Sequence, residues 1–289
     1  NRPMSTFNTF VLAIVQGLAE LLPISSSAHV IIAEKLLGLD PTSPPMTLLL
    51  VMLHTGTMVA VIVYFWRQWC ATYFQSLAAF RGFAGRVIVA TVLTAVVGEG
   101  IWLGIAKTAL AGHPHAEIEE LFGRLEIIAP ALAVGGILIL VAGLIAARRP
   151  APPGDDTLRL GQASVIGAVQ GLCLPFRGFS RSGATISAGL LLGVSRRQAE
   201  AFSFALAVVL TPAVVAREAL RLLHSQGLGS AGVAGAVWQS VLGALVAFVA
   251  GLVALRWLSR WLEGGRWYWF GIYCLIAAAA VGLLHAQGY

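Results

Sequence analysis

The stretch Gly178-Phe179-Ser180-Arg181-Ser182-Gly183-Ala184-Thr185 lies between two apolar segments of the chain. An arginine at membrane depth is costly unless an anionic or polar partner compensates it. Here Arg181 is surrounded by hydroxyl groups and by the backbone N–H groups of a predicted loop, and all of these are hydrogen-bond donors. A phosphate is the ligand that suits such a loop best, because guanidinium and phosphate form a bidentate hydrogen-bonded pair. The alternative is an ordinary polar turn whose arginine reaches up to the membrane surface.

The composition predicts a polytopic membrane protein. The 289 residues are 58% hydrophobic and only 11% charged, with a mean hydropathy of +0.83, whereas soluble domains carry about 25% charged residues. We expect a single membrane domain over 1–289. The net charge of +6 is too dispersed for nucleic-acid binding, and the three scattered cysteines indicate neither a disulfide framework nor a metal cluster.

Two apolar segments are interrupted, at 8–39 and 160–194, and neither half of either segment has the roughly 20 residues needed to cross a bilayer. Each therefore predicts a re-entrant helix hairpin. Six full spans are predicted elsewhere, which makes about ten helices in all; they are 47–66, 87–106, 127–147, 200–220, 233–255 and 267–284. Between them we expect a basic loop at 67–86, an acidic loop at 107–126 and a polar linker at 148–159.

The two interrupted segments resemble each other. Val15-Gln16-Gly17-Leu18 recurs as Val169-Gln170-Gly171-Leu172, and each is followed by a proline and a serine-rich turn. Because three predicted spans separate the hairpins, they enter from opposite faces. We therefore expect an inverted repeat, approximately 1–150 and 151–289, with the substrate site near the midplane where the repeats meet.

Arginine placement predicts the orientation. The side that carries the loops at 67–86 and 148–159 is far more basic than the other. The positive-inside rule places that side in the cytoplasm, and both termini outside. Six tryptophans also fall at predicted span ends, as interfacial aromatics do; they are Trp66, Trp69, Trp257, Trp261, Trp267 and Trp269.

The first hairpin carries the other reactive side chains. Gln16 and Glu20 are four residues apart and share one helix face. Glu20 is the only acid there, which predicts a metal, proton or cation partner, with a structural ion pair as the alternative. The Ser25-Ser26-Ser27 turn and His29 supply either a nucleophile and its base or a histidine that itself attacks phosphorus. His54, inside a predicted span, either lines the same cavity or is structural.

These residues resemble the integral-membrane undecaprenyl-pyrophosphate phosphatases of the bacitracin-resistance type. The resemblance covers essentially the whole chain and rests on two motifs, Gln16-Gly17-Leu18-Ala19-Glu20-Leu21-Leu22-Pro23-Ile24-Ser25-Ser26-Ser27-Ala28-His29 and Gly178-Phe179-Ser180-Arg181-Ser182-Gly183-Ala184-Thr185-Ile186-Ser187. It implies an all-α fold of six transmembrane helices and two re-entrant pairs. It also implies removal of the terminal phosphate of the C55 isoprenyl diphosphate, on the outer face of the bacterial inner membrane, so that the lipid phosphate is reused in cell-wall synthesis.

The resemblance also implies residue roles. Ser26 matches the nucleophile, and His29 matches the base or alternative nucleophile. Glu20 matches a carboxylate linked to magnesium or calcium, with Gln16 as its companion ligand. Arg181 holds the diphosphate with the help of Ser180, Ser182 and Thr185. Beyond the resemblance, we expect further diphosphate contacts from four neighbouring residues, which are Gly178, Arg177, Ser25 and Ser27.

Three positions depart from the family pattern. Gln16 stands where many members have glutamate, so a cation site loses one charged ligand. Ala28 replaces the commonest glycine. Arg177-Gly178 replaces the familiar Pro-Gly, with the proline displaced to 175, and adds a second cation beside the predicted phosphate loop.

Two other functions fit parts of the pattern. A lipid flippase or transporter would use the same inverted repeat and the Arg181 loop, but would not need Ser26 or His29. An intramembrane serine protease would use a serine and His29, but an arginine-rich site suits an anion better than a peptide carbonyl. The expected partners are an isoprenyl diphosphate and membrane lipids, and a homodimer is left open.

Overall fold

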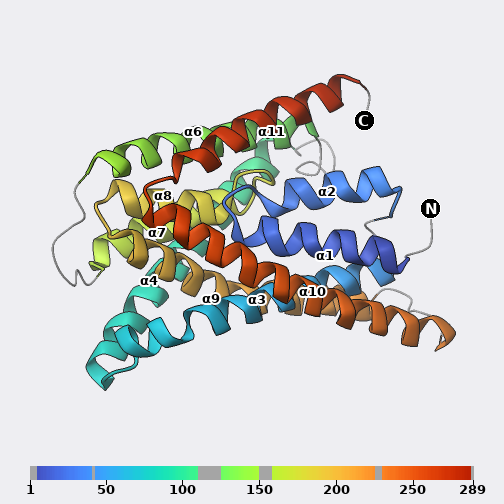
Figure 1. The fold of residues 1–289 in the computed structure, drawn as a ribbon, viewed down its shortest axis with the longest axis horizontal. Coiled ribbons are helices and arrows are strands. Elements are labelled where there is room, and N and C mark those ends of the chain that lie inside the picture. Colours follow the sequence, from blue (N-terminus) through green and yellow to red (C-terminus); the bar gives the residue numbers. More distant parts are fainter. Residues whose placement is uncertain (1–4, 41–42, 110–124, 150–157, 225–229, 288–289) are drawn as a thin grey trace. The chain divides into compact units, whose positions relative to one another are not determined.

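A computed structural model describes residues 5–40, 43–109, 125–149, 158–224 and 230–287. These residues form ten α-helices and no strand (Figure 1). The helices are α1 (Thr6–Leu21), α2 (Ser26–Leu37), α3 (Pro44–Tyr73), α4 (Leu77–Ala109), α6 (Leu125–Arg148), α7 (Leu160–Cys173), α8 (Arg181–Leu191), α9 (Arg196–His224), α10 (Ser230–Glu263) and α11 (Tyr268–Ala286). The all-helical membrane fold predicted from composition is confirmed.

Five of the described helices are long and apolar enough to cross a membrane, namely α3, α4, α6, α10 and α11. The sixth predicted span, 200–220, lies within α9, a helix of 29 residues in which several side chains lie outside the described part of the chain. Helices α1, α2, α7 and α8 have 11 to 16 residues. They are the short halves predicted for the two hairpins.

The predicted basic loop at 67–86 is wrong. Helix α3 continues to Tyr73 and α4 begins at Leu77, so only residues 74–76 connect them. Polar residues end a membrane span but do not end a helix, because backbone hydrogen bonding continues past the apolar region. The predicted loops at 107–126 and 148–159 fall partly outside the described residues, at 110–124 and 150–157.

The described chain divides into two compact units. The first contains Asn1–Leu22, Ser26–Arg67 and Ala207–Leu258, and the second contains Pro23–Ser25, Gln68–Leu206 and Ser259–Tyr289. Helices α1 and α2 pack together in the first unit, and α7 and α8 pack together in the second (Figure 1). Each unit is thus built around one hairpin. The division into repeats near residue 150 stays a prediction.

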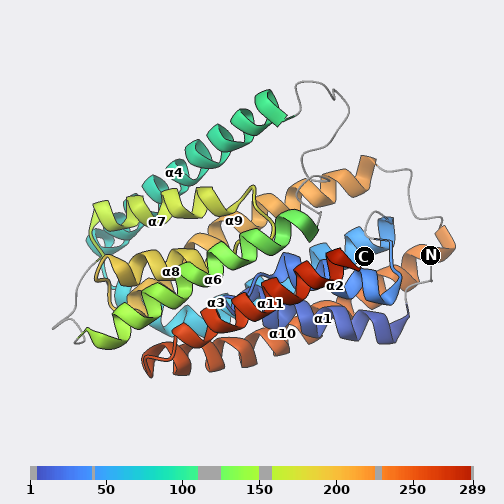
Figure 2. The ribbon, with the colours of Figure 1, turned by 90° about the horizontal axis from the view of Figure 1, so that it is seen from above.

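A glycine in each hairpin brings its first helix against a long helix. A Cβ at Gly17 of α1 would lie 2.6 Å from Ala250 Cβ and 2.8 Å from the Ala247 carbonyl oxygen, both on α10. A Cβ at Gly171 of α7 would lie 2.6 Å from the Thr94 carbonyl oxygen and 2.8 Å from Val97 Cβ, both on α4. Figure 2 shows α7 beside α4.

The two contacts are made by corresponding positions of the two repeats. Gly17 and Gly171 are 154 positions apart, and each contact residue on α4 has its counterpart on α10 153 positions later. The second helix of each hairpin also ends in the same way, with Gly38 at φ 66° and Gly193 at φ 76°. A glycine tolerates this left-handed conformation at a helix C-terminus. The correspondence supports a repeat in which each hairpin packs on a helix of the other half.

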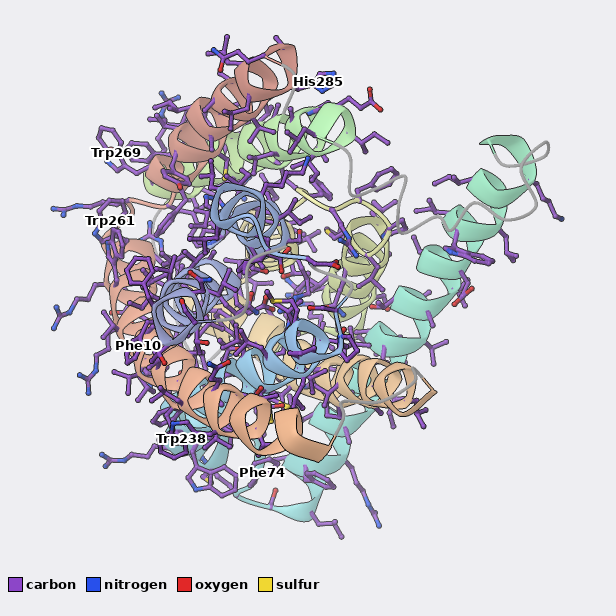
Figure 3. The ribbon with its side chains drawn as sticks, turned by 90° about the vertical axis from the view of Figure 1, so that its right-hand side faces the viewer. Phe10, Phe74, Trp238, Trp261, Trp269 and His285 are labelled. Carbon is purple, nitrogen blue, oxygen red and sulfur yellow. The ribbon has the colours of Figure 1, made fainter. Side chains whose placement is uncertain are left out.

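Two of the six tryptophans expected at the interface are instead buried. Trp69 is 6% exposed and its indole N–H donates to the Ala201 carbonyl at 3.3 Å. Trp267 is 1% exposed and donates to the Ser187 hydroxyl at 3.0 Å. Trp269, 47% exposed, points outward with Trp261 (Figure 3). A position at a span end therefore does not by itself make a tryptophan face lipid.

We expect Gly17→Ala to destabilise the protein, because the new methyl group has no space against α10. Overpacking of this kind costs about 1–3 kcal/mol, so the unfolding temperature in detergent should fall. Gly100→Ala on α4 is the control, because a Cβ there meets nothing within 4 Å and alanine favours a helix. Equal unfolding temperatures for the two variants would contradict the close packing of α1 on α10.

Candidate active site

The turn of the first hairpin is short and strained. Helix α1 ends at Leu21, and the Leu22 N–H still donates to the Leu18 carbonyl at 3.0 Å. The chain then turns through Pro23 and restarts as α2 at Ser26. Ser25, just before α2, has φ 69°, the one non-glycine residue with positive φ among those described. Strained backbone of this kind is typical of functional sites, and here it places Ser26 in the first turn of α2.

Glu20 is the centre of a polar cluster formed by α1, α2 and α3. Its Oε2 accepts a hydrogen bond from the Ser26 hydroxyl at 2.5 Å and another from the Gln16 amide at 3.2 Å. His54 Nε2 lies 3.8 Å from the same oxygen. The Glu20 side chain is only 16% exposed. The structure therefore brings together Gln16, Glu20, Ser26 and His54, all in the first unit.

The orientation of His54 follows from its other ring nitrogen. Nδ1 lies 2.9 Å from the Leu50 carbonyl oxygen, and because a carbonyl oxygen only accepts, Nδ1 carries a proton. Nε2 is therefore the atom that faces the Glu20 carboxylate, and it attracts that carboxylate only when it is protonated as well. The sequence alone allows His54 either to line the cavity or to have a structural role. Its position beside Glu20 places it at the polar cluster.

The Arg181 loop is pressed against α6 in the second unit. Gly178 has φ 100°, and a Cβ there would lie 2.6 Å from the Ile128 carbonyl oxygen, so no larger residue fits. A Cβ at Gly183 would lie 2.6 Å from Ile139 Cδ1. Gly178 therefore allows close contact with the backbone of α6, and Gly183 leaves space for the Ile139 side chain.

The predicted loop over Gly178–Thr185 is only partly a loop. Helix α8 begins at Arg181, because the Ser180 side chain accepts from the Gly183 N–H at 3.2 Å and caps the helix. Arg181 and Ser182 therefore lie in the first helical turn. A helix N-terminus carries partial positive charge and exposes N–H groups, so the revised geometry still favours an anion beside the guanidinium.

Thr185 is a positioning residue in this structure. It is fully buried, and its hydroxyl donates to the Arg181 carbonyl at 2.8 Å. That hydroxyl has one proton, so the Ser203 hydroxyl, 2.6 Å away, donates to Thr185. This network ties the first turn of α8 to α9 and argues against direct contact between Thr185 and a ligand. Ser203 was missed, because a lone serine between two phenylalanines carries no signal in the sequence.

The remaining predicted site residues divide by exposure. Ser25, Ser180 and Ser182 are buried, His29 and Ser27 are half-buried, and Arg177 is exposed beside Gly178. The Glu20 cluster belongs to the first unit and the Arg181 loop to the second. That both meet at one substrate remains the prediction of the inverted repeat.

The donor set for a divalent cation is small. Gln16 and Glu20 supply one amide and one carboxylate, and among the described residues no three His, Cys, Asp or Glu side chains come together as metal ligands. Calcium takes six to eight oxygens, whereas magnesium is commonly held by one or two carboxylates together with substrate phosphates. Of the two ions in the sequence-based expectation, magnesium therefore fits these side chains better.

Comparison with known proteins agrees with the two motifs. The family model described as "Bacitracin resistance protein BacA" matches residues 9–280. Undecaprenyl-diphosphatase 2 of Acinetobacter baylyi is 54% identical over 282 residues, which cover 96% of this chain and 97% of that protein. Undecaprenyl-diphosphatase of Rhodopirellula baltica is 34% identical over 277 residues, with coverage of 96% and 97%. The chain therefore belongs to the BacA family of bacitracin resistance proteins.

Proposed function

We propose that the protein is an undecaprenyl-diphosphatase, a multi-pass membrane enzyme that hydrolyses undecaprenyl diphosphate to undecaprenyl phosphate and phosphate. The names of two relatives that match nearly the whole chain support this function. The 2.5 Å hydrogen bond from Ser26 to Glu20 is the single observation that carries the chemistry. A hydroxyl that already donates to a half-buried carboxylate has a base to take its proton.

In the proposed reaction Ser26 Oγ attacks the terminal phosphorus and its proton passes to Glu20. The bond from that phosphorus to the bridging oxygen breaks, and undecaprenyl phosphate leaves with the electron pair. Water then attacks the phosphoserine phosphorus, with His29 as the base that removes its proton. The bond from phosphorus to Ser26 Oγ breaks, Ser26 takes its proton back from Glu20, and phosphate is released. Arg181 and the first turn of α8 stabilise the charge on the transferred phosphoryl group.

We propose that a magnesium ion, when bound, is held by Glu20 and the Gln16 amide oxygen together with diphosphate oxygens. Its chemistry there would be to neutralise phosphate charge. The Gln16 amide N–H already donates to Glu20 at 3.2 Å, so Gln16 also orients this carboxylate without a metal.

The active site is proposed to face the outer side of the bacterial inner membrane, with both termini outside. The excess of arginine in the loops of the opposite side supports this orientation. A flippase built on the same repeat is the second candidate, but it gives no role to the Ser26–Glu20 contact.

We expect Ser26→Ala to lower kcat/KM for undecaprenyl diphosphate by roughly 10³-fold or more, as removal of a nucleophile does. Acid-quenched enzyme should carry the labelled terminal phosphate in wild type and none in Ser26→Ala, since a phosphoserine survives acid. Ser27→Ala is the matched control and should keep the label. If alkali-quenched Ser26→Ala enzyme carries a label that acid removes, His29 is the nucleophile instead.

Arg181→Ala is expected to reduce phosphate release by roughly 10³-fold, the lower end of what an arginine contributes to phosphoryl transfer. Arg181→Lys should recover only part of this, because an ammonium cannot form the bidentate fork. Arg177→Ala tests the neighbouring exposed cation and should have a smaller effect. Near wild-type release by Arg181→Ala would overturn the assignment of the diphosphate loop.

Gln16→Glu tests the cation proposal. In a chelator the two carboxylates, four residues apart on α1, should repel, and the unfolding temperature should fall. Magnesium should restore it, since a ligand that binds only the folded state stabilises that state. Gln16→Met is the uncharged control and should show no magnesium response beyond that of wild type. If magnesium fails to stabilise Gln16→Glu, the Gln16 and Glu20 side chains do not form a cation site.

A further inference from the structure

The second unit holds another basic site, away from its own hairpin turn. A cavity of about 420 Å³ opens where the first turns of α4 meet the start of α7, within the second unit. Figure 2 shows these two helices side by side. We call this cavity the basic groove; it is lined by Arg81, Gly82, Gly85, Arg86, Leu158, Arg159 and Leu160.

The basic groove lies at the opposite end of α7 from the Arg181 loop. That loop follows Cys173, the last residue of α7, whereas Arg159 precedes its first residue. Fourteen helical residues at 1.5 Å each separate the two ends by about 20 Å. The basic groove is therefore no part of the diphosphate loop.

Among the described residues, three arginines and no acid line the basic groove. In the described part of the chain, none of the three forms a salt bridge with a carboxylate. The positive end of the α7 dipole points to the same place, because Arg159 immediately precedes the helix. Like charges gathered around one hollow repel each other, so an anion in the basic groove relieves that repulsion.

Two glycines, which have no side chain beyond Cα, leave the space that forms the basic groove. Gly82 and Gly85 are three residues apart on α4 and share one face. A Cβ at Gly85 meets nothing within 4 Å, and a Cβ at Gly82 comes no nearer than 3.5 Å, to the Arg86 side chain. The space suits a phosphate with a small polar head, and is too small for a complete phospholipid.

Exposed apolar side chains lie beside the same charges. Leu160, in the wall of the basic groove, is 54% exposed, and Phe80, next to Arg81, is 45% exposed. The distribution of arginines along the sequence predicts that this end of α4 and α7 lies at the cytoplasmic surface of the membrane. Basic pockets between membrane helices at this surface bind anionic lipid headgroups.

We propose that the basic groove binds the headgroup phosphate of an anionic phospholipid, with the acyl chains lying outside along Leu160 and Phe80. The guanidinium groups of Arg81, Arg86 and Arg159 hold the phosphate. This site shares no residue with the proposed catalytic site, so it stands or falls independently of the proposed phosphatase activity.

Native mass spectrometry of the full-length protein in detergent tests the proposal, with phosphatidylglycerol as the probe and phosphatidylcholine as the zwitterionic comparison. Wild type should retain one phosphatidylglycerol with at least tenfold higher affinity than phosphatidylcholine. The triple variant R81Q/R86Q/R159Q should lose this preference. The charge-matched control R67Q/R256Q/R260Q, which removes three arginines outside the basic groove, should keep it.

The variant Gly85→Leu tests the contribution of the basic groove's shape separately from that of its charge. It fills the basic groove without changing the net charge, and should weaken phosphatidylglycerol binding about tenfold, whereas Gly100→Leu, also in open space on α4, should not. An equal loss in the two triple variants would show general attraction to a basic surface and overturn the site. Displacement of the lipid by millimolar inorganic phosphate would make the ligand a soluble anion and overturn the lipid assignment.

Discussion

The fold depends on one constraint, which is that the broken backbone of a re-entrant hairpin cannot face lipid. Its unpaired groups must be covered by protein or reached by water. Gly17 of α1 and Gly171 of α7 meet this requirement. Each lets its short helix approach a long helix, α10 or α4, to backbone contact. The reactive side chains then follow from these placements, since Glu20 lies one turn after Gly17 and the diphosphate loop follows soon after Gly171.

The Glu20 cluster and the Arg181 loop offer different chemical groups. Glu20 collects the Ser26 hydroxyl, the Gln16 amide and the His54 ring around one carboxylate oxygen. The Arg181 loop supplies a guanidinium and a helix N-terminus, positioned by the buried Thr185–Ser203 hydrogen bond. In the proposed reaction, the Glu20 cluster activates the nucleophile and the Arg181 loop neutralises phosphate charge.

The sequence predicted the hairpins well because proline, glycine and serine interrupt apolar runs too short to span. The first apolar run of each interrupted segment ends in the sequence at Leu22 or Leu174, and α1 and α7 end one residue earlier, at Leu21 and Cys173. It failed where a helix cap, a long-range contact or the continuation of a helix beyond its apolar residues decides the structure. Arg181 lies in a helix because Ser180 caps it, and Trp267 is buried because Ser187, 80 residues earlier, accepts its N–H. The basic loop at 67–86 was wrong because helices α3 and α4 continue past their apolar residues.

Cross-linking of the two turns tests most directly whether they form one site. Cysteines at Ser27 and Arg177, in a chain whose three native cysteines are replaced, would report on the distance between the first hairpin and the diphosphate loop. We predict that a short bifunctional thiol reagent cross-links the two introduced cysteines, and that undecaprenyl diphosphate slows this cross-linking. Both cysteines reacting singly with a maleimide, while no cross-link forms with or without substrate, would contradict a shared active site.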